Sequence, residues 1–184
     1  MVNSKKKGNR GELRICKILS ERFNVKFNRV PNSGAFGTTH VLQIDAQMVL
    51  SGDLICPKLW VFDVEIKFGY DLDLINFFAD KEHSDKKTFK GFCEQACEDA
   101  SRIKGRIPMV LYTKDRKETI VAIPRKNNSR SSFLSKMVKQ GERDFFLVNF
   151  ELEKFPKWKE WIVMSLPEII KEEDSFFFDE EKIK

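Results

Sequence analysis

The chain has 184 residues, a formal net charge of +5 and an apolar fraction of 41%. This length is typical of one domain and buries enough surface to form a hydrophobic core. Every apolar run is shorter than the roughly 18 residues needed to cross a bilayer, which excludes an integral membrane protein. The lysine-rich N-terminus has no apolar stretch behind it and predicts no secretory signal, and the four cysteines lie in apolar patterns typical of a reducing compartment, so we expect a cytoplasmic, intracellular protein.

Residues 9–24 predict a helix, because Ile15, Cys16, Leu19 and Phe23 recur at helical spacing with Asn9 as a possible cap. Glu12 lies on the same inward stripe, one turn earlier. Alternation then predicts strands over 25–31, 52–57 and 59–69, with a turn-rich loop at 32–40. Residues 41–50 show no clear period, and residues 72–79 indicate a short helix.

The second half begins with the clearest helical stripe of the chain, over 88–104. Strands are predicted at 107–113 and 118–124, paired around a charged turn, and again at 144–150 and 160–165. Short helices are expected near 133–140 and 167–172, and the last ten residues are expected to fray. This order of elements predicts an α/β fold with a mixed central β-sheet flanked by helices. We expect a single domain over 1–184, with a core of about 5–124, a C-terminal extension of about 125–184 and an acidic tail at 172–184.

Basic residues are concentrated at the N-terminal end. Residues 1–29 hold nine Lys or Arg and two acidic residues, whereas residues 151–184 hold six basic and ten acidic residues. This asymmetry predicts a polyanionic partner near the N-terminal third. A solvated lysine tail explains Lys5, Lys6 and Lys7 equally well.

Charged side chains converge on the strand predicted at 59–69. Glu65 and Lys67 are two residues apart, so both project from one face of that strand. Asp53 lies on the neighbouring predicted strand, and Glu12 points inward from the preceding helix. Mg²⁺ prefers oxygen ligands and keeps several waters, so two or three carboxylates suffice to hold it, and an adjacent lysine can offset charge on a phosphate. The alternative interpretation is that Glu65 and Lys67 form an exposed pair on a half-solvated sheet.

These residues resemble the PD-(D/E)XK nuclease superfamily. The matching pattern is Gly52-Asp53 followed by Glu65-Ile66-Lys67. Within the superfamily the chain is most similar to archaeal-type and viral Holliday-junction resolvases, on the segments KKKGNRGEL (5–13) and RVPNSG (29–34). The resemblance covers roughly residues 5–113 and implies a restriction-endonuclease-like αβββαβ core.

The resemblance implies a Mg²⁺-dependent endodeoxyribonuclease, with Mn²⁺ as a substitute ion, that hydrolyses phosphodiester bonds in branched or four-way-junction DNA. It implies metal ligation by Glu12, Asp53, Glu65 and the carbonyl of Ile66, with Lys67 as the catalytic lysine and Ser33 near the scissile phosphate. Because a junction needs two symmetric nicks, we expect a homodimer. The sequence indicates neither a membrane partner nor, without a phosphate-binding glycine-rich motif, a nucleotide cofactor. Phosphate contacts are expected from the following basic residues: Lys5, Lys6, Lys7, Arg10, Arg29, Arg125, Lys126 and Arg130.

Several alternatives stay open at this point. Gly52 stands where the family pattern has proline, and the long gap between Ser33 and Asp53 leaves Asp45 as a rival for the motif aspartate. Gln95 is a weak match to a glutamine of some branches. A nuclease of repair, restriction or end-processing type, or a non-catalytic nucleic-acid-binding module, would share the same fold.

Overall fold

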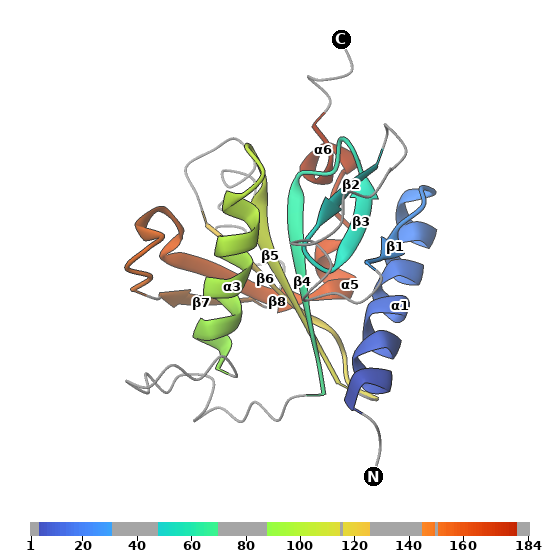
Figure 1. Ribbon diagram of the computed structural model, residues 1–184, viewed down its shortest axis with the longest axis horizontal. Coiled ribbons are helices and arrows are strands. Elements are labelled where there is room, and N and C mark those ends of the chain that lie inside the picture. The colour runs from blue at the N-terminus through green and yellow to red at the C-terminus, as the bar shows by residue number, and fades with distance from the viewer. Residues whose placement is uncertain are drawn as a thin grey trace.

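A five-stranded sheet forms the centre of the molecule in a computed structural model, which describes residues 4–30, 48–69, 88–114, 116–125, 145–149 and 151–179 (Figure 1). Its strand order is β4-β5-β6-β8-β7. The strands are β4 (Phe62–Phe68), β5 (Ile107–Thr113), β6 (Ile120–Pro124), β8 (Glu160–Ser165) and β7 (Phe145–Asn149). β4 and β5 are parallel and the other neighbours are antiparallel, which confirms the predicted mixed sheet.

A smaller three-stranded sheet lies beside β4, in the order β1-β3-β2. It consists of β1 (Asn28–Arg29), β3 (Leu54–Pro57) and β2 (Met48–Ser51). β1 is much shorter than the strand predicted over 25–31, and β2 lies where the sequence shows no period. Asp53 was expected on a strand, but it occupies the turn between β2 and β3.

Two long helices flank β4. α1 (Ser4–Phe23) begins earlier than predicted, so Asn9 lies inside the helix and does not cap it. α3 (Phe89–Ser101) begins after Thr88, whose hydroxyl oxygen accepts a hydrogen bond from the Gly91 backbone N–H at 3.1 Å. Figure 1 shows α3 on the left of β4 and α1 on its right. In the described part of the chain, no helix is long and apolar enough to cross a membrane.

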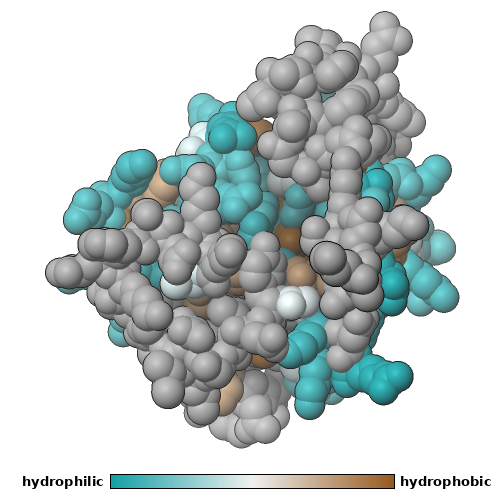
Figure 2. All heavy atoms as spheres, turned by 60° about the horizontal axis from the view of Figure 1, so that its bottom comes forward, coloured by the Kyte–Doolittle hydropathy of each residue, from teal (hydrophilic) through white to brown (hydrophobic). Residues whose placement is uncertain are grey.

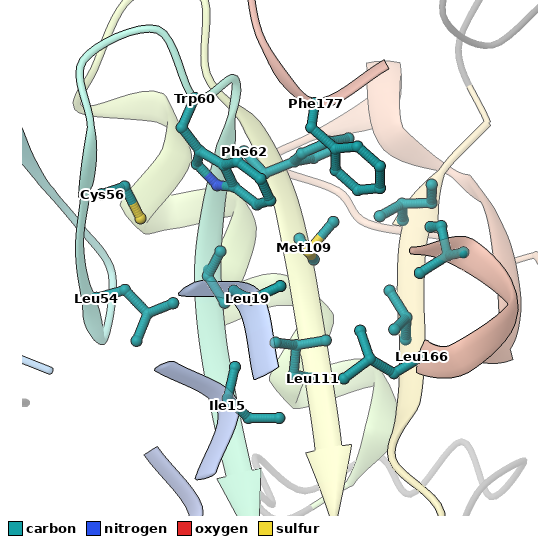
Figure 3. Close-up of a cluster of buried hydrophobic side chains, with 14 of the residues drawn as sticks. Ile15, Leu19, Leu54, Cys56, Trp60, Phe62, Met109, Leu111, Leu166 and Phe177 are labelled. Atoms are coloured by element: carbon teal, nitrogen blue, oxygen red, sulfur yellow. The ribbon is translucent and has the colours of Figure 1, made fainter. Parts of the chain in front are cut away.

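The sheet buries a separate apolar cluster on each face. Phe62, Val64 and Ile66 of β4 pack into the larger cluster with α1, β5 and the C-terminal segment (Figure 3). Phe92 and Cys93 of α3 belong to the second cluster, against β5, β6 and β8. The strand predicted over 59–69 therefore alternates as expected, but it begins only at Phe62.

The C-terminal segment closes the larger cluster. It contains α5 (Leu166–Ile169) and α6 (Asp174–Phe177), whereas Trp158 of the preceding 3-10 helix η1 (Pro156–Trp158) belongs to the second cluster. The Phe177 ring stacks on Trp60 at a centroid distance of 5.4 Å, and Phe178 forms a β-bridge with Trp60. The prediction of a frayed end is therefore wrong for residues 175–179, because their aromatic rings complete the core. The helices predicted at 72–79 and 133–140 lie outside the described residues.

Candidate active site

The turn before β3 is joined to the open edge of β4. Gly52 forms a parallel bridge with Val64, and the Asp53 backbone N–H donates to the Val64 carbonyl at 2.8 Å. The Asp53 Oδ2 atom then accepts the Ile66 N–H at 2.8 Å. Because a strand residue directs its N–H and C=O to the same edge, the Ile66 carbonyl faces the same side as Asp53. The geometry brings together Asp53 and Ile66, as the resemblance implied.

Gly52 allows the backbone of the turn to lie close to β4. Its φ is +59°, and a Cβ atom there would lie 2.3 Å from the Val64 carbonyl oxygen and 2.7 Å from Asp63 Oδ1. Proline has a φ near −65° and cannot adopt this conformation. The glycine in place of the family proline is therefore a requirement of this turn.

Glu65 and Lys67 lie on the opposite face of β4 from the aromatic cluster and are directed toward α3. Lys67 Nζ forms an ion pair with Glu65 Oε1 and donates to Gln95 Oε1 at 2.9 Å. The Glu65 and Lys67 side chains are only 5% and 12% exposed. The interpretation of these two residues as an exposed surface pair is therefore wrong.

The two carboxyl groups of this edge are electrostatically strained in the absence of a cation. Burial, and next the charge of Asp53, raise the pKa of Glu65 to about 8. Burial also raises the pKa of Asp53 to about 6, although the hydrogen bond from Ile66 lowers it and the charge of Glu12 adds to the rise. Buried carboxylates that repel one another are a donor set that a hard divalent cation relieves.

Glu12 is buried close to these groups but is engaged elsewhere. Its Oε2 atom forms an ion pair with Arg29 Nε at 2.9 Å, and a second Arg29 nitrogen donates to Asn9 Oδ1 at 3.0 Å. Within the described ranges no three His, Cys, Asp or Glu side chains form a group that could hold a metal ion. Since Mg²⁺ is commonly bound through one or two carboxylates and several waters, Asp53, Glu65 and the Ile66 carbonyl fit such an ion without a third carboxylate.

α3 contributes Gln95, which the sequence matched only weakly to a family glutamine, and two side chains that sequence reasoning did not assign, Phe92 and Asp99. Phe92 places its ring 5.3 Å from Lys67 Nζ, and the charge of Asp99 raises the pKa of both Asp53 and Glu65. The pKa of Asp99 is itself raised by burial. Phe92, Gln95 and Asp99 follow one another at intervals of three and four residues, which places them on one helix face. The spacing indicates a shared helix face, but only the packing of α3 on β4 shows that this face lies against Glu65 and Lys67.

The predicted phosphate-binding residues are in several environments. Arg10 is exposed on α1, and Arg125 lies 3.7 Å from Glu160. Arg29 is bound to Glu12. Figure 2 shows hydrophilic residues on the right-hand side, where α1 lies in Figure 1, and also at the upper left and centre of the view. Lys5, Lys6 and Lys7 belong to α1, while Ser33, Asp45, Lys126 and Arg130 lie outside the described residues.

Comparison with known proteins finds a matching family and a similar protein. Residues 3–176 match a protein family described as "Phage putative PDDEXK endonuclease". The chain is also similar to Protein D14 of Escherichia phage T5, with 28% identity over 126 residues, which cover 66% of this chain and 71% of that protein. No solved structure matches the chain. The family match extends through β7, β8 and α5, beyond the segment on which the sequence resemblance was based.

Proposed function

Because the chain belongs to the family of phage PDDEXK endonucleases, we propose that it is a metal-dependent endodeoxyribonuclease with its chemistry at Asp53, Glu65 and Lys67. One observation carries this proposal. Asp53 is fixed to the β4 edge by the Ile66 N–H, beside a buried Glu65–Lys67 pair on the same strand. Clustered buried carboxylates are costly to a fold unless they have a function, which favours an enzyme over a non-catalytic DNA-binding module.

Asp53, Glu65 and the Ile66 carbonyl would hold Mg²⁺, with Mn²⁺ as a substitute. Such an ion supplies Lewis-acid stabilisation of the phosphodiester and lowers the pKa of a bound water. Lys67 keeps its ammonium beside the carboxylates, where it stabilises negative charge that develops on the phosphate. Gln95 restricts the ammonium to this position through its 2.9 Å hydrogen bond.

Glu12 and Arg29 act together in this proposal. The Arg29 guanidinium neutralises the buried Glu12 carboxylate when no DNA is bound. A DNA phosphate competes with Glu12 for Arg29, because both are anions that accept paired hydrogen bonds from a guanidinium. Exchange of Arg29 onto the phosphate would remove this ion pair from Glu12 and let the carboxylate turn toward the metal, which combines the ligand role that the resemblance implies for Glu12 with the phosphate contact expected of Arg29.

We propose branched DNA, such as a four-way junction, as the substrate. One chain carries one set of Asp53, Glu65 and Lys67, and two symmetric nicks need two sets, which a two-fold homodimer provides. Of the aromatic residues near the C-terminus that could form a dimer surface, Trp158 and Trp161 are buried, whereas Phe146 on β7 is 70% exposed. A nuclease of repair, restriction or end-processing type is the alternative, since the site chemistry is the same for all of them.

The test is incubation with four-way junction, flap and linear duplex DNA, each with and without Mg²⁺. We expect cleavage only with the ion, a preference for the junction, and a dimer by light scattering. Lys67→Ala should lower cleavage by orders of magnitude with little change in DNA affinity, since phosphate contacts to the rest of the protein stay in place. Lys117→Ala, at the exposed β5–β6 turn, is the matched control. Cleavage of all three DNAs at equal rates by a monomer would favour the alternative, and an unimpaired Lys67→Ala protein would refute the proposed site.

A further inference from the structure

We propose that Phe92 is a positioning residue that holds the Lys67 ammonium at the reaction site. The proposal rests on the catalytic function proposed for Lys67. The ring centroid of Phe92 lies 5.3 Å from Lys67 Nζ, within the range of a cation–π contact. The Phe92 side chain is fully buried and that of Lys67 is only 12% exposed, so water screens this contact weakly.

The hydrogen-bond donors of Lys67 explain why an aromatic ring suits this position. An ammonium has three N–H donors and no acceptor. Among the residues that the structure describes, Nζ donates to Glu65 Oε1 and Gln95 Oε1. A third oxygen acceptor would saturate the ammonium. The face of Phe92 attracts the cation through its quadrupole and leaves one N–H available for a phosphate oxygen or a water.

The helix fixes the ring and the amide as one unit. Phe92 and Gln95 are three residues apart, so both project from the side of α3 that faces β4. The Thr88 hydroxyl caps the first turn of α3, directly before Phe92. Without the ring, only Glu65 and Gln95 would hold the ammonium, and its side toward α3 would lose a contact. Phe92 therefore balances the attraction of Glu65.

Fluorinated phenylalanines test this role with little change of shape. Successive ring fluorines weaken the negative face of the ring, and we would introduce them at position 92 and, as a control, at Phe89. Phe89 is one helical turn earlier and is also buried in the second cluster. At position 92, we expect kcat on the cleaved DNA to fall in a graded manner, to about one tenth with the most fluorinated ring, at unchanged KM. At position 89 we expect no graded change.

A second measurement does not depend on activity. In the metal-free protein, the ε-methylene protons of Lys67 should be shifted upfield by the ring current of Phe92, and this shift should disappear in Phe92→Leu but persist in Phe89→Leu. Equal effects of fluorination at the two positions, or unshifted Lys67 protons, would overturn the proposal. If no form of the protein cleaves DNA, the proposed function fails, and the resonance shift alone then decides whether Phe92 holds the ammonium.

Discussion

The two faces of β4 are buried to a similar degree but bury opposite chemistry. Val64 and Ile66 are 0% and 7% exposed within the aromatic cluster, whereas Glu65 is 4% exposed beside Lys67. The side chains of a strand alternate between its faces, so one seven-residue strand carries both environments. Apolar burial on one face of β4 therefore offsets the free-energy cost of desolvating charged groups on the other. Substitutions on the two faces should therefore change the free energy of unfolding by different amounts and in opposite directions.

The largest effect on stability is expected on the aromatic face. Phe62→Ala should lower the free energy of unfolding by about 3–5 kcal/mol, because it leaves a cavity beneath Trp60 and Phe177. Glu65→Gln, on the same strand and similarly buried, should change it much less, since a neutral amide removes the repulsion from Asp53. Urea denaturation in a chelating buffer measures both. Equal losses for the two variants would contradict the proposed division between the faces.

The turn that carries Asp53 couples stability to metal binding. Gly52→Ala adds both the strain of a left-handed backbone and a clash with the Val64 carbonyl, so we expect a loss of about 3 kcal/mol and weak Mn²⁺ binding. Gly69→Ala is the control, because φ there is +79° but a Cβ would meet no atom within 4 Å. That variant should lose about 1 kcal/mol and bind Mn²⁺ normally. If both variants bind Mn²⁺ equally, the close approach of Gly52 to β4 does not position Asp53.

The pH dependence of the free energy of unfolding should arise from the charged face of β4 and not from its apolar face. In the metal-free protein the pKa of Asp53 is raised to about 6 and that of Glu65 to about 8. Between their ordinary values near 4 and these raised values, the folded state binds more protons than the unfolded state, so the free energy of unfolding falls as the pH rises. The expected slope is at most about 1.4 kcal/mol per pH unit for each group.

Denaturation series at several pH values measure this slope. Glu65→Gln should flatten it toward the alkaline end of the window and Asp53→Asn toward the acidic end, while Phe62→Ala should shift the whole curve down without changing its shape. A wild-type protein that becomes more stable as the pH rises through this window would show that folding does not raise the pKa values of the two carboxyl groups.

The smallest expected effect comes from the helix that covers the charged face. Asp99 is engaged with Arg102 at 2.8 Å, yet its charge still reaches Asp53 and Glu65. Asp99→Asn should weaken Mn²⁺ binding by roughly twofold to fivefold, as expected for the loss of one nearby negative charge. Glu98→Gln, its more exposed neighbour, should have no effect on calorimetric titrations with Mn²⁺. A loss beyond about a hundredfold would instead identify Asp99 as a direct ligand.

Local sequence patterns predict the parts of this fold that are governed by periodicity. The strands over 107–113 and 160–165 have the predicted bounds, and the alternation around Glu65 assigns each side chain to its observed face. The spacing could not show that Arg29 binds Glu12, because that pair joins α1 to β1. Nor could it place Asp53 against Ile66, since this contact depends on the backbone conformation of Gly52. The short helix of Phe176 and Phe177 has too few residues for a period, and its docking depends on the core that it meets.

The stacking of Phe177 on Trp60 can form during synthesis only after all five strands of the central sheet have been made. A chain that has emerged from the ribosome only as far as β8 has all five strands of the central sheet but lacks the rings that close the cluster around Trp60. The Val61 N–H donates to the Phe177 carbonyl, and the Leu59 carbonyl accepts from the Asp179 N–H, so these two hydrogen bonds at the start of β4 form only when Phe177 and Asp179 arrive. Translation thus supplies the residues that anchor the start of β4 after all five strands of the sheet, and the strand that carries Glu65 and Lys67 is held in full only once they have emerged.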